Sequence, residues 1–348
     1  MLQLSRVACA RAQYLRDTGK FYVGPEYASR RATFEAALVT IRAHNTRSSS
    51  YKLGISAHTD KTEEEWTTYM KGYNREVAFA TQGAAHTPPP VEQPAVALPD
   101  ALDWREHKIV TDVKDQASCG SCWAFSATET MESAVAKATG RLVTLAPQEY
   151  VDCAPNPRQC GGTGGCEGST QWLAFNFSVG HGLSLSADYN YTAREGTCRE
   201  RSVASAVSIA GYERLQSNDY SSLLTALATH GPIAISVSAT WRHYEEGVYD
   251  DKCGTTIDHA VQLVGYGTDE ASGKMYWLVR NSWGTSWGES GYIRIRRYGE
   301  GAEPCGVDRS PQSGTACKGA AKTMKVCGLC GIMSDSSYPI GVNLTTRM

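Results

Sequence analysis

Residues 116–125 read Gln-Ala-Ser-Cys-Gly-Ser-Cys-Trp-Ala-Phe and lead into a stretch with few helix breakers that continues to Gly140. Glycine suits a helix end because it adopts a left-handed conformation at little cost. The pattern therefore predicts a helix whose first turn carries Cys122. A thiol at that place faces unpaired backbone N–H groups and the positive end of the helix dipole, and both favour the nucleophilic thiolate. Gln116 supplies an uncharged amide donor that can reach the same space.

Two cysteines separated by two residues could instead form a redox pair or part of a zinc site. Residues 119–123, Cys-Gly-Ser-Cys-Trp, carry a local signature that is much more specific than such a pair. The stretch resembles the nucleophile region of the papain/cathepsin cysteine proteases. The resemblance implies an α+β, papain-like fold of two lobes, with a helical lobe over residues 98–210 and an antiparallel β-barrel-like lobe over residues 211–348.

The second half of the chain changes to period-two or continuous apolar runs between glycines, which predicts antiparallel strands at residues 233–237, 260–264, 276–279 and 293–295. His259 opens one of these strands and Asn281 closes another, at about the separations from Cys122 that are usual for the family. The resemblance makes them a Cys-His-Asn site. The imidazole would hold the thiolate and protonate the leaving amine, and the Asn amide would fix its tautomer. Gln116 and the Cys122 N–H would stabilise the oxyanion.

The resemblance also implies a substrate groove. Gly168 and Ser169 would form the edge that pairs with the substrate backbone, with Ser169 in place of the usual glycine. Further substrate-binding positions are Thr170, Ile257, Asp258, Ala260, Trp283 and Asp335. Trp283 would cover the His–Asn contact. Asp335 would be the floor of the P2 pocket and could accept an Arg side chain there; the alternative is a solvent-facing Asp in a Ser-rich turn.

The first part of the chain resembles a cathepsin L-like propeptide. Residues 26–45 have a helical pattern, and within it Glu26, Arg30, Phe34, Ile41 and Asn45 follow the spacing of the long propeptide helix of these zymogens. Residues 54–60 are a weaker match to a second propeptide motif. Five of the 13 prolines then fall between residues 88 and 99, in a composition typical of exposed, cleavable segments. We therefore expect an inhibitory propeptide at residues 1–97, a peptidase domain at residues 98–348, and processing near Leu98.

The chain has 12 cysteines, which point to an oxidising or endolysosomal compartment. By resemblance, three disulfides are implied: Cys119–Cys166, Cys153–Cys198 and Cys253–Cys330. Residues 299–328 form a longer segment than the family's usual turn and contain three more cysteines. Cys305 is an alternative partner for Cys253, and Cys317, Cys327 and Cys330 could bind zinc, although a disulfide-knotted insert is favoured. Cys9 and Cys160 have no assigned partner.

The remaining features narrow the class of protein. A net charge of −2 gives no general attraction to nucleic acid, and no apolar run is long enough to span a bilayer. Residues 1–16 contain no convincing signal peptide, which conflicts with the cysteine content unless the N-terminus is truncated. We expect a monomer without metal or cofactor, located in a lysosome- or vacuole-like acidic compartment or secreted. Its partners would be peptide and protein substrates and its own propeptide.

These features predict a cysteine endopeptidase made as a self-inhibited zymogen that is activated at acid pH. Internal cleavage is expected because no His-containing insertion resembling an exopeptidase's occluding loop lies beside the Gly-rich turn. Two alternatives remain. The same Cys-His-Asn set could transfer the acyl group to an amine, as a peptide ligase does, or the chain could be a catalytically silent binding homologue.

Overall fold

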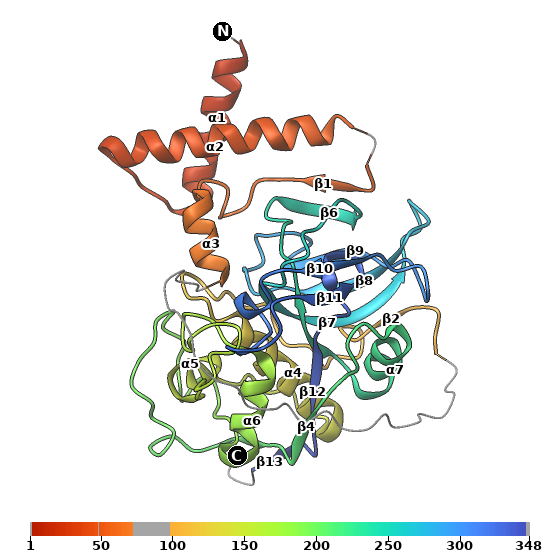
Figure 1. Ribbon diagram of the computed structural model, residues 1–348. Helices are drawn as coiled ribbons and strands as arrows, with labels where there is room; N and C mark the ends of the chain where they lie inside the picture. Colours follow the sequence, from red (N-terminus) through yellow and green to blue (C-terminus); the bar gives the residue numbers. More distant parts are fainter. Residues whose placement is uncertain (1, 48, 72–97, 346–348) are drawn as a thin grey trace.

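A computed structural model describes residues 2–47, 49–71 and 98–345. The N-terminal segment contains α1 (Leu2–Thr18), α2 (Gly24–Asn45), β1 (Tyr51–Leu53) and α3 (Glu63–Lys71). Figure 1 shows α1 crossing α2 above the rest of the molecule, with α3 descending towards it. The predicted apolar stripe of α2 holds this crossing together, because Phe34 and Leu38 pack with Tyr14 of α1. Helix α1 itself is not predicted from the sequence.

The helical lobe is built around α4 (Cys122–Thr139), with α5 (Pro147–Cys153) and α6 (Gln171–His181) beside it. Helix α4 begins at Cys122 and ends before Gly140, which adopts the left-handed conformation with φ of 73°. Trp123, Met131 and Val135 are fully buried, so α4 lies inside the protein rather than on its surface. A largely apolar helix of this kind is stable only when other elements cover it on all sides.

The strand lobe contains one nine-stranded sheet in the order β1-β6-β9-β8-β7-β5-β12-β4, with β2 also paired to β7. Its strands are β2 (Leu102–Asp103), β4 (Gly211–Arg214), β5 (Ile233–Val237), β6 (Tyr244–Tyr249), β7 (His259–Thr268), β8 (Met275–Arg280), β9 (Tyr292–Arg296) and β12 (Ser336–Ile340). The pairing is antiparallel as predicted, except that β6 and β9 are parallel. Helix α7 (Tyr220–His230) packs against β5 and β7, and β3 (Val207–Ser208) pairs with β13 (Asn343–Leu344). The predicted two-lobed α+β fold is confirmed.

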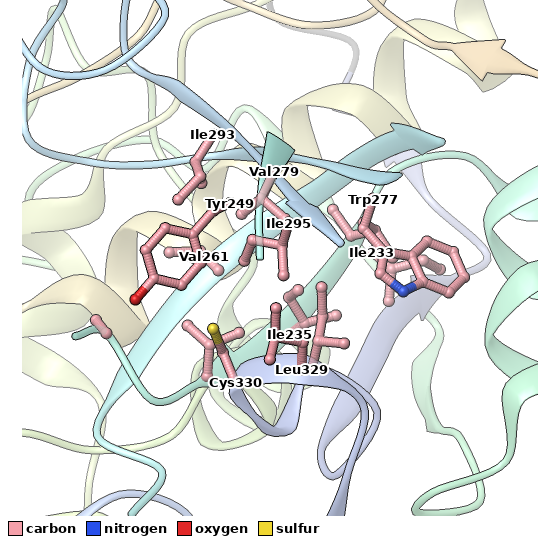
Figure 2. Packing of buried hydrophobic residues seen from close by; sticks show 14 of the residues in the cluster. Ile233, Ile235, Tyr249, Val261, Trp277, Val279, Ile293, Ile295, Leu329 and Cys330 are labelled. Carbon is pink, nitrogen blue, oxygen red and sulfur yellow. The ribbon is translucent and has the colours of Figure 1, made fainter. Parts of the chain in front are cut away.

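A large apolar core holds the strand lobe together. Figure 2 shows side chains from β5, β7, β8 and β9 meeting in one cluster, together with Leu329 and Cys330 from the short 3₁₀ helix Leu329–Gly331. Strand β1 of the N-terminal segment adds to the edge of this sheet, with Tyr51 opposite Gly247 of β6. The N-terminal segment is therefore attached to the strand lobe by main-chain pairing.

Buried polar contacts join the two lobes beneath the groove. The Arg280 guanidinium of β8 lies 3.5 Å from the Glu129 carboxylate of α4, and both side chains are almost completely buried. Ser126 Oγ of α4 donates to the Val261 carbonyl of β7 at 2.7 Å. A buried charge pair is costly to break because the remaining charge has no solvation. These contacts fix the start of α4 relative to the start of β7.

The described residues form five disulfides. Three have the pairing implied by resemblance: Cys119–Cys166, Cys153–Cys198 and Cys253–Cys330. Cys305 pairs with Cys327 between β10 (Cys305–Asp308) and β11 (Met324–Cys327), so the alternative Cys253–Cys305 pairing is wrong. Cys160 pairs with Cys317, a partner that the sequence did not assign. The zinc interpretation is also wrong, because its three cysteines belong to three separate disulfides.

Among the described helices, none has the length and apolar character needed to cross a bilayer.

Candidate active site

Cys122 is the first residue of α4 and one of two cysteines left as free thiols in the described part of the chain; the other is Cys9. Its side chain is 7% exposed. Burial raises the pKa of the Cys122 thiol to about 11, while hydrogen bonds from the backbone of Ala260 and Trp123 act in the opposite direction. The predicted helix-terminus effect is therefore present, but burial outweighs it in this conformation.

His259 is the first residue of β7 and is held in one tautomer. Its Nε2 lies 2.8 Å from Asn281 Oδ1, an oxygen that also accepts the Ser282 backbone N–H at 2.8 Å. Because that oxygen can only accept, Nε2 carries the proton and Nδ1 is an acceptor. Nδ1 is buried and makes no hydrogen bond within the described structure. Trp283 stacks on the ring with centroids 4.9 Å apart.

The thiol and the imidazole share one narrow pocket, which Cys122 and His259 both line. Burial lowers the pKa of His259 to about 4, although its bond to Asn281 acts to raise it. With a raised thiol pKa and a lowered imidazole pKa, this conformation favours the neutral thiol and neutral imidazole over two separate charges. Forming the ion pair requires that water enter the groove or that the two charges stabilise each other.

Gln116 is completely buried and contacts the two segments that carry Cys122 and Asn281, through Cys119 and Ser282. Its Oε1 accepts from Ser282 Oγ at 2.7 Å, and its main-chain N–H donates to the Ser282 carbonyl at 2.9 Å. Its Nε2 donates to the Cys119 carbonyl at 3.1 Å and to the Tyr69 carbonyl at 3.3 Å. Tyr69 belongs to α3 of the N-terminal segment. A carbonyl of that segment therefore occupies the donor predicted to bind the oxyanion.

Aromatic side chains of the N-terminal segment cover this end of the site. Trp66 packs edge-on against Trp283 with centroids 4.7 Å apart, and His58 Nε2 donates to the Trp283 carbonyl at 3.3 Å. The Tyr69 hydroxyl donates to Asp115 at 3.0 Å. Arg242 of the strand lobe donates to the His58 carbonyl at 2.7 Å and lies over the Trp66 ring. The sequence identified the segment as a propeptide but gave no sign of these contacts.

Of the eight predicted substrate-binding residues, four line the pocket that contains Cys122 and His259. They are Gly168, Ser169, Asp258 and Ala260, whereas Thr170 and Ile257 are fully buried. Asp258 also accepts a hydrogen bond from the Ala239 N–H at 3.1 Å. Four further lining residues were missed by sequence reasoning: Gly161, Ser236, Ser313 and Gly314. Two of these come from the segment between β10 and β11, whose position in space no local pattern reveals.

For Asp335 the structure excludes the solvent-facing interpretation, and its role as the floor of the P2 pocket stays a prediction. Asp335 is only 4% exposed, so it is not a solvent-facing residue. Its carboxylate accepts from Gln171 Nε2 at 2.8 Å, from Ser236 Oγ at 2.9 Å and from Arg214 at 3.1 Å. The carboxylate is thus already paired inside the protein, and one of its donors, Ser236, lines the pocket that contains Cys122.

One cluster in the described residues has metal-type ligands. Cys153, Cys198 and Glu200 place three such atoms within 4.8 Å of one another. The two sulfurs are joined in a disulfide and are not thiolates, so this group is not a metal centre.

Comparisons of the chain with known proteins identify its family. Residues 98–315 match the model of the papain family cysteine proteases, and residues 12–66 match that of the cathepsin propeptide inhibitor domain. The chain belongs to the papain family of cysteine proteases and carries a cathepsin-type propeptide domain.

Its relatives include several plant proteases. The probable cysteine protease RD21B of Arabidopsis thaliana is 40% identical over 324 residues, covering 91% of this chain and 62% of the relative. Fruit bromelain of Ananas comosus is 35% identical over 317 residues, covering 88% of this chain and 86% of the relative. The chain spans 58–62% of the length of RD21B and of three similar plant proteases.

Solved precursor structures have the same overall fold. A recombinant stem bromelain precursor is 34% identical and superimposes with a TM-score of 0.78, covering 96% of this chain and 99% of that one. Digestive procathepsin L 3 from the larval midgut of Tenebrio molitor is 29% identical, with a TM-score of 0.76 and the same coverage of both chains. The likeness therefore includes the N-terminal segment as well as the two lobes.

Proposed function

We propose that this chain is the zymogen of a cysteine endopeptidase in which Cys122, His259, Asn281 and Gln116 carry out catalysis. The observation that carries the proposal is the His259–Asn281 hydrogen bond, which leaves Nδ1 unpartnered in the pocket shared with Cys122. Nδ1 would accept the thiol proton, and the thiolate would attack the substrate carbonyl. The imidazolium would then protonate the leaving amine, and water would hydrolyse the thioester and restore the thiol.

The oxyanion of each tetrahedral intermediate would accept hydrogen bonds from Gln116 Nε2 and the Cys122 N–H. Gln116 is well suited to this role because Ser282 holds its other amide atom, so the donor is oriented before substrate arrives. The Tyr69 carbonyl on the same donor supports inhibition by the propeptide. A substrate carbonyl cannot use that donor fully until α3 leaves.

Acid activation would act through His58 rather than through the propeptide carboxylates. Burial lowers the pKa of His58 to about 4, whereas a free His titrates near 6.5. Between those values the detached propeptide binds a proton that the docked one does not, so docking weakens as pH falls through that window. Burial acts to raise the pKa of both Asp60 and Glu65, but Lys20 and Arg30 respectively hold each below its ordinary value. Protonation of these two carboxylates would therefore weaken propeptide docking only at more acid pH.

Processing near Leu98 and a protein with a peptidase domain at residues 98–348 follow from this proposal. Residues 72–97, which precede this site, lie outside the described structure. Five disulfides support a secreted or lysosome/vacuole-like location, because reducing compartments rarely maintain them.

The test is acid incubation of the full-length chain and of Cys122→Ala. We expect the wild-type chain to give a new N-terminus near residue 98 together with peptidase activity that iodoacetamide abolishes. Cys122→Ala should remain full-length and inactive while keeping the same thermal unfolding midpoint. Peptide hydrolysis by Cys122→Ala at the wild-type rate would contradict the proposal. Transfer of the acyl group to an added amine in preference to water would instead support a ligase.

A further inference from the structure

Residues 310–318, here called the strap, lie between β10 and β11 and begin on the strand-lobe side of the groove. The Cys305–Cys327 disulfide closes the base of this hairpin. Buried Asp308 accepts the Ile257 backbone N–H at 3.2 Å, and Thr255 Oγ1 donates to the Val307 carbonyl at 2.8 Å. These contacts fix the start of the strap against the segment that leads to His259.

The far end of the strap is attached to the helical lobe. Cys317 forms a disulfide with Cys160, 157 residues earlier in the chain, in the Gly-rich loop before Gly168. The Gly161 N–H donates to the Ala316 carbonyl at 3.1 Å, and the Lys318 N–H donates to the Arg158 carbonyl at 3.0 Å. The strap therefore crosses from one lobe to the other and is covalently attached on both sides.

The middle of the strap fills the space between the two walls of the groove. Ser313 and Gly314 line the same pocket as Cys122. A Cβ added to Gly314 would lie 1.7 Å from the Ile257 carbonyl oxygen, and one added to Gly161 would lie 2.5 Å from the Gly314 carbonyl oxygen. Such distances are far inside van der Waals contact, so main chain meets main chain with no room for a side chain between them.

This crossing point coincides with the proposed substrate path. Gly168 and Ser169, the edge that would pair with the substrate backbone, are both buried. The pocket between them and His259 leaves about 10 Å³ for the centre of a water molecule, which is roughly the space of one water. Gly314 of the strap lies against Ile257, which the resemblance assigns to the P2 pocket, and against Gly161, which in turn lies against the Ser169 carbonyl. A peptide that runs from Cys122 along this edge would therefore meet the strap.

We propose that the strap limits the acyl side of the substrate to two residues before the scissile bond. The inference rests on the Cys122–His259 chemistry of the proposed function and changes where the enzyme cuts: with the Cys160–Cys317 disulfide in place, it removes short pieces from a free N-terminus in place of internal cleavage. Without that bond, the strap can leave the groove and the enzyme cleaves internal bonds. The expectation of unrestricted internal cleavage considered only a His-containing insertion beside the Gly-rich turn, whereas the blocking segment comes from the other lobe.

The experiment uses a series of peptides with one scissile bond, one leaving group, and one to five residues before the bond. Alanine fills P2 and the positions beyond it, because the pocket has little free space. For the acid-processed wild-type enzyme we expect kcat/KM to fall at least tenfold when a third residue is added. For Cys160→Ser/Cys317→Ser we expect no such step, with the two-residue peptide cleaved at a similar rate.

A matched control is Cys153→Ser/Cys198→Ser, which removes a disulfide from the helical lobe but leaves the strap attached, and should keep the step. A second strap variant replaces residues 310–318 with Gly-Ser-Gly together with Cys160→Ser, so that misfolding of one variant does not decide the result. The inference would be overturned if the wild type cleaved peptides of all lengths with equal kcat/KM. It would also be overturned if both strap variants kept the fall in kcat/KM on addition of a third residue. Cleavage of no peptide by any variant would overturn the proposed function, and the inference with it.

Discussion

The groove is covered from two sides, and the two covers are attached in different ways. The N-terminal segment lies over Trp283 and Gln116 through hydrogen bonds, ring packing and the β1–β6 pairing. The strap lies beside Gly168 and Ser169 and is held by the Cys160–Cys317 disulfide, while Cys305–Cys327 closes the base of its hairpin. The first cover can leave after one chain cleavage, whereas the second remains. The comparison suggests that one cover controls when the enzyme acts and the other controls which peptides it accepts.

Substitution of Gln116 should change activity most, because this residue both binds the N-terminal segment through Tyr69 and belongs to the proposed catalytic set. In Gln116→Ala the oxyanion loses a donor, and we expect kcat of the processed enzyme to fall about 10²–10³-fold. The same change removes the bond to Tyr69, so the isolated propeptide should bind this variant more weakly. Steady-state kinetics and propeptide titration measure the two effects. A normal kcat would show that Gln116 only holds the propeptide.

Trp66 belongs to the first cover alone. Trp66→Ala removes the buried indole that packs against Trp283. We expect this to weaken the binding free energy of the propeptide by ~3 kcal/mol, which is about a hundredfold in affinity. We expect the full-length chain to cleave a short peptide at neutral pH, which the wild-type zymogen should not do. The enzyme processed from this variant should have wild-type kcat/KM. The Trp66→Phe zymogen should be inhibited more strongly than the Trp66→Ala zymogen. A fully inhibited Trp66→Ala zymogen would mean that this contact does not hold the cover in place.

His58 should determine the pH at which the first cover is released. The positive charges of Lys61 and Lys20 and the negative charge of Asp115 act on it, but burial is the main reason for its low pKa. Gln can donate the same bond to the Trp283 carbonyl without titrating, so His58→Gln should move the activation midpoint to lower pH. Activity after incubation from pH 7 to pH 4 measures the midpoint. The exposed His107→Gln is the control, and an unchanged midpoint in His58→Gln would exclude this mechanism.

Asp335 should give the smallest effect on activity, because its carboxylate is already paired. Asp335→Asn is expected to lower the free energy of unfolding by about 1–2 kcal/mol, since it weakens three internal hydrogen bonds. The ratio of rates for P2-Arg and P2-Leu peptides should stay the same. Thermal unfolding and these two substrates provide the measurements. A specific loss of P2-Arg cleavage would show that the carboxylate reaches the substrate after all.

The sequence predicted features that depend on local pattern. Helix α4 and its first residue follow from the Cys-Gly-Ser-Cys-Trp signature and Gly140, and the strand that begins at His259 and the strand that ends just before Asn281 follow from their apolar periodicity. The sequence did not reveal which distant segments meet. The partner of Cys160 lies 157 residues away, and Gln171 reaches Asp335 across 164 residues. Such contacts depend on how the lobes pack, which no window of sequence contains.

The central claim is that His259 activates Cys122 once the first cover has gone, and the pH dependence of Cys122 alkylation by iodoacetamide tests it directly. In the full-length chain, burial raises the pKa of the thiol to about 11, so alkylation should be slow at pH 5 to 8. The processed enzyme should react rapidly at pH 5, and His259→Ala should abolish that rapid reaction. Equally slow alkylation before and after processing, or rapid alkylation that does not depend on His259, would contradict the account.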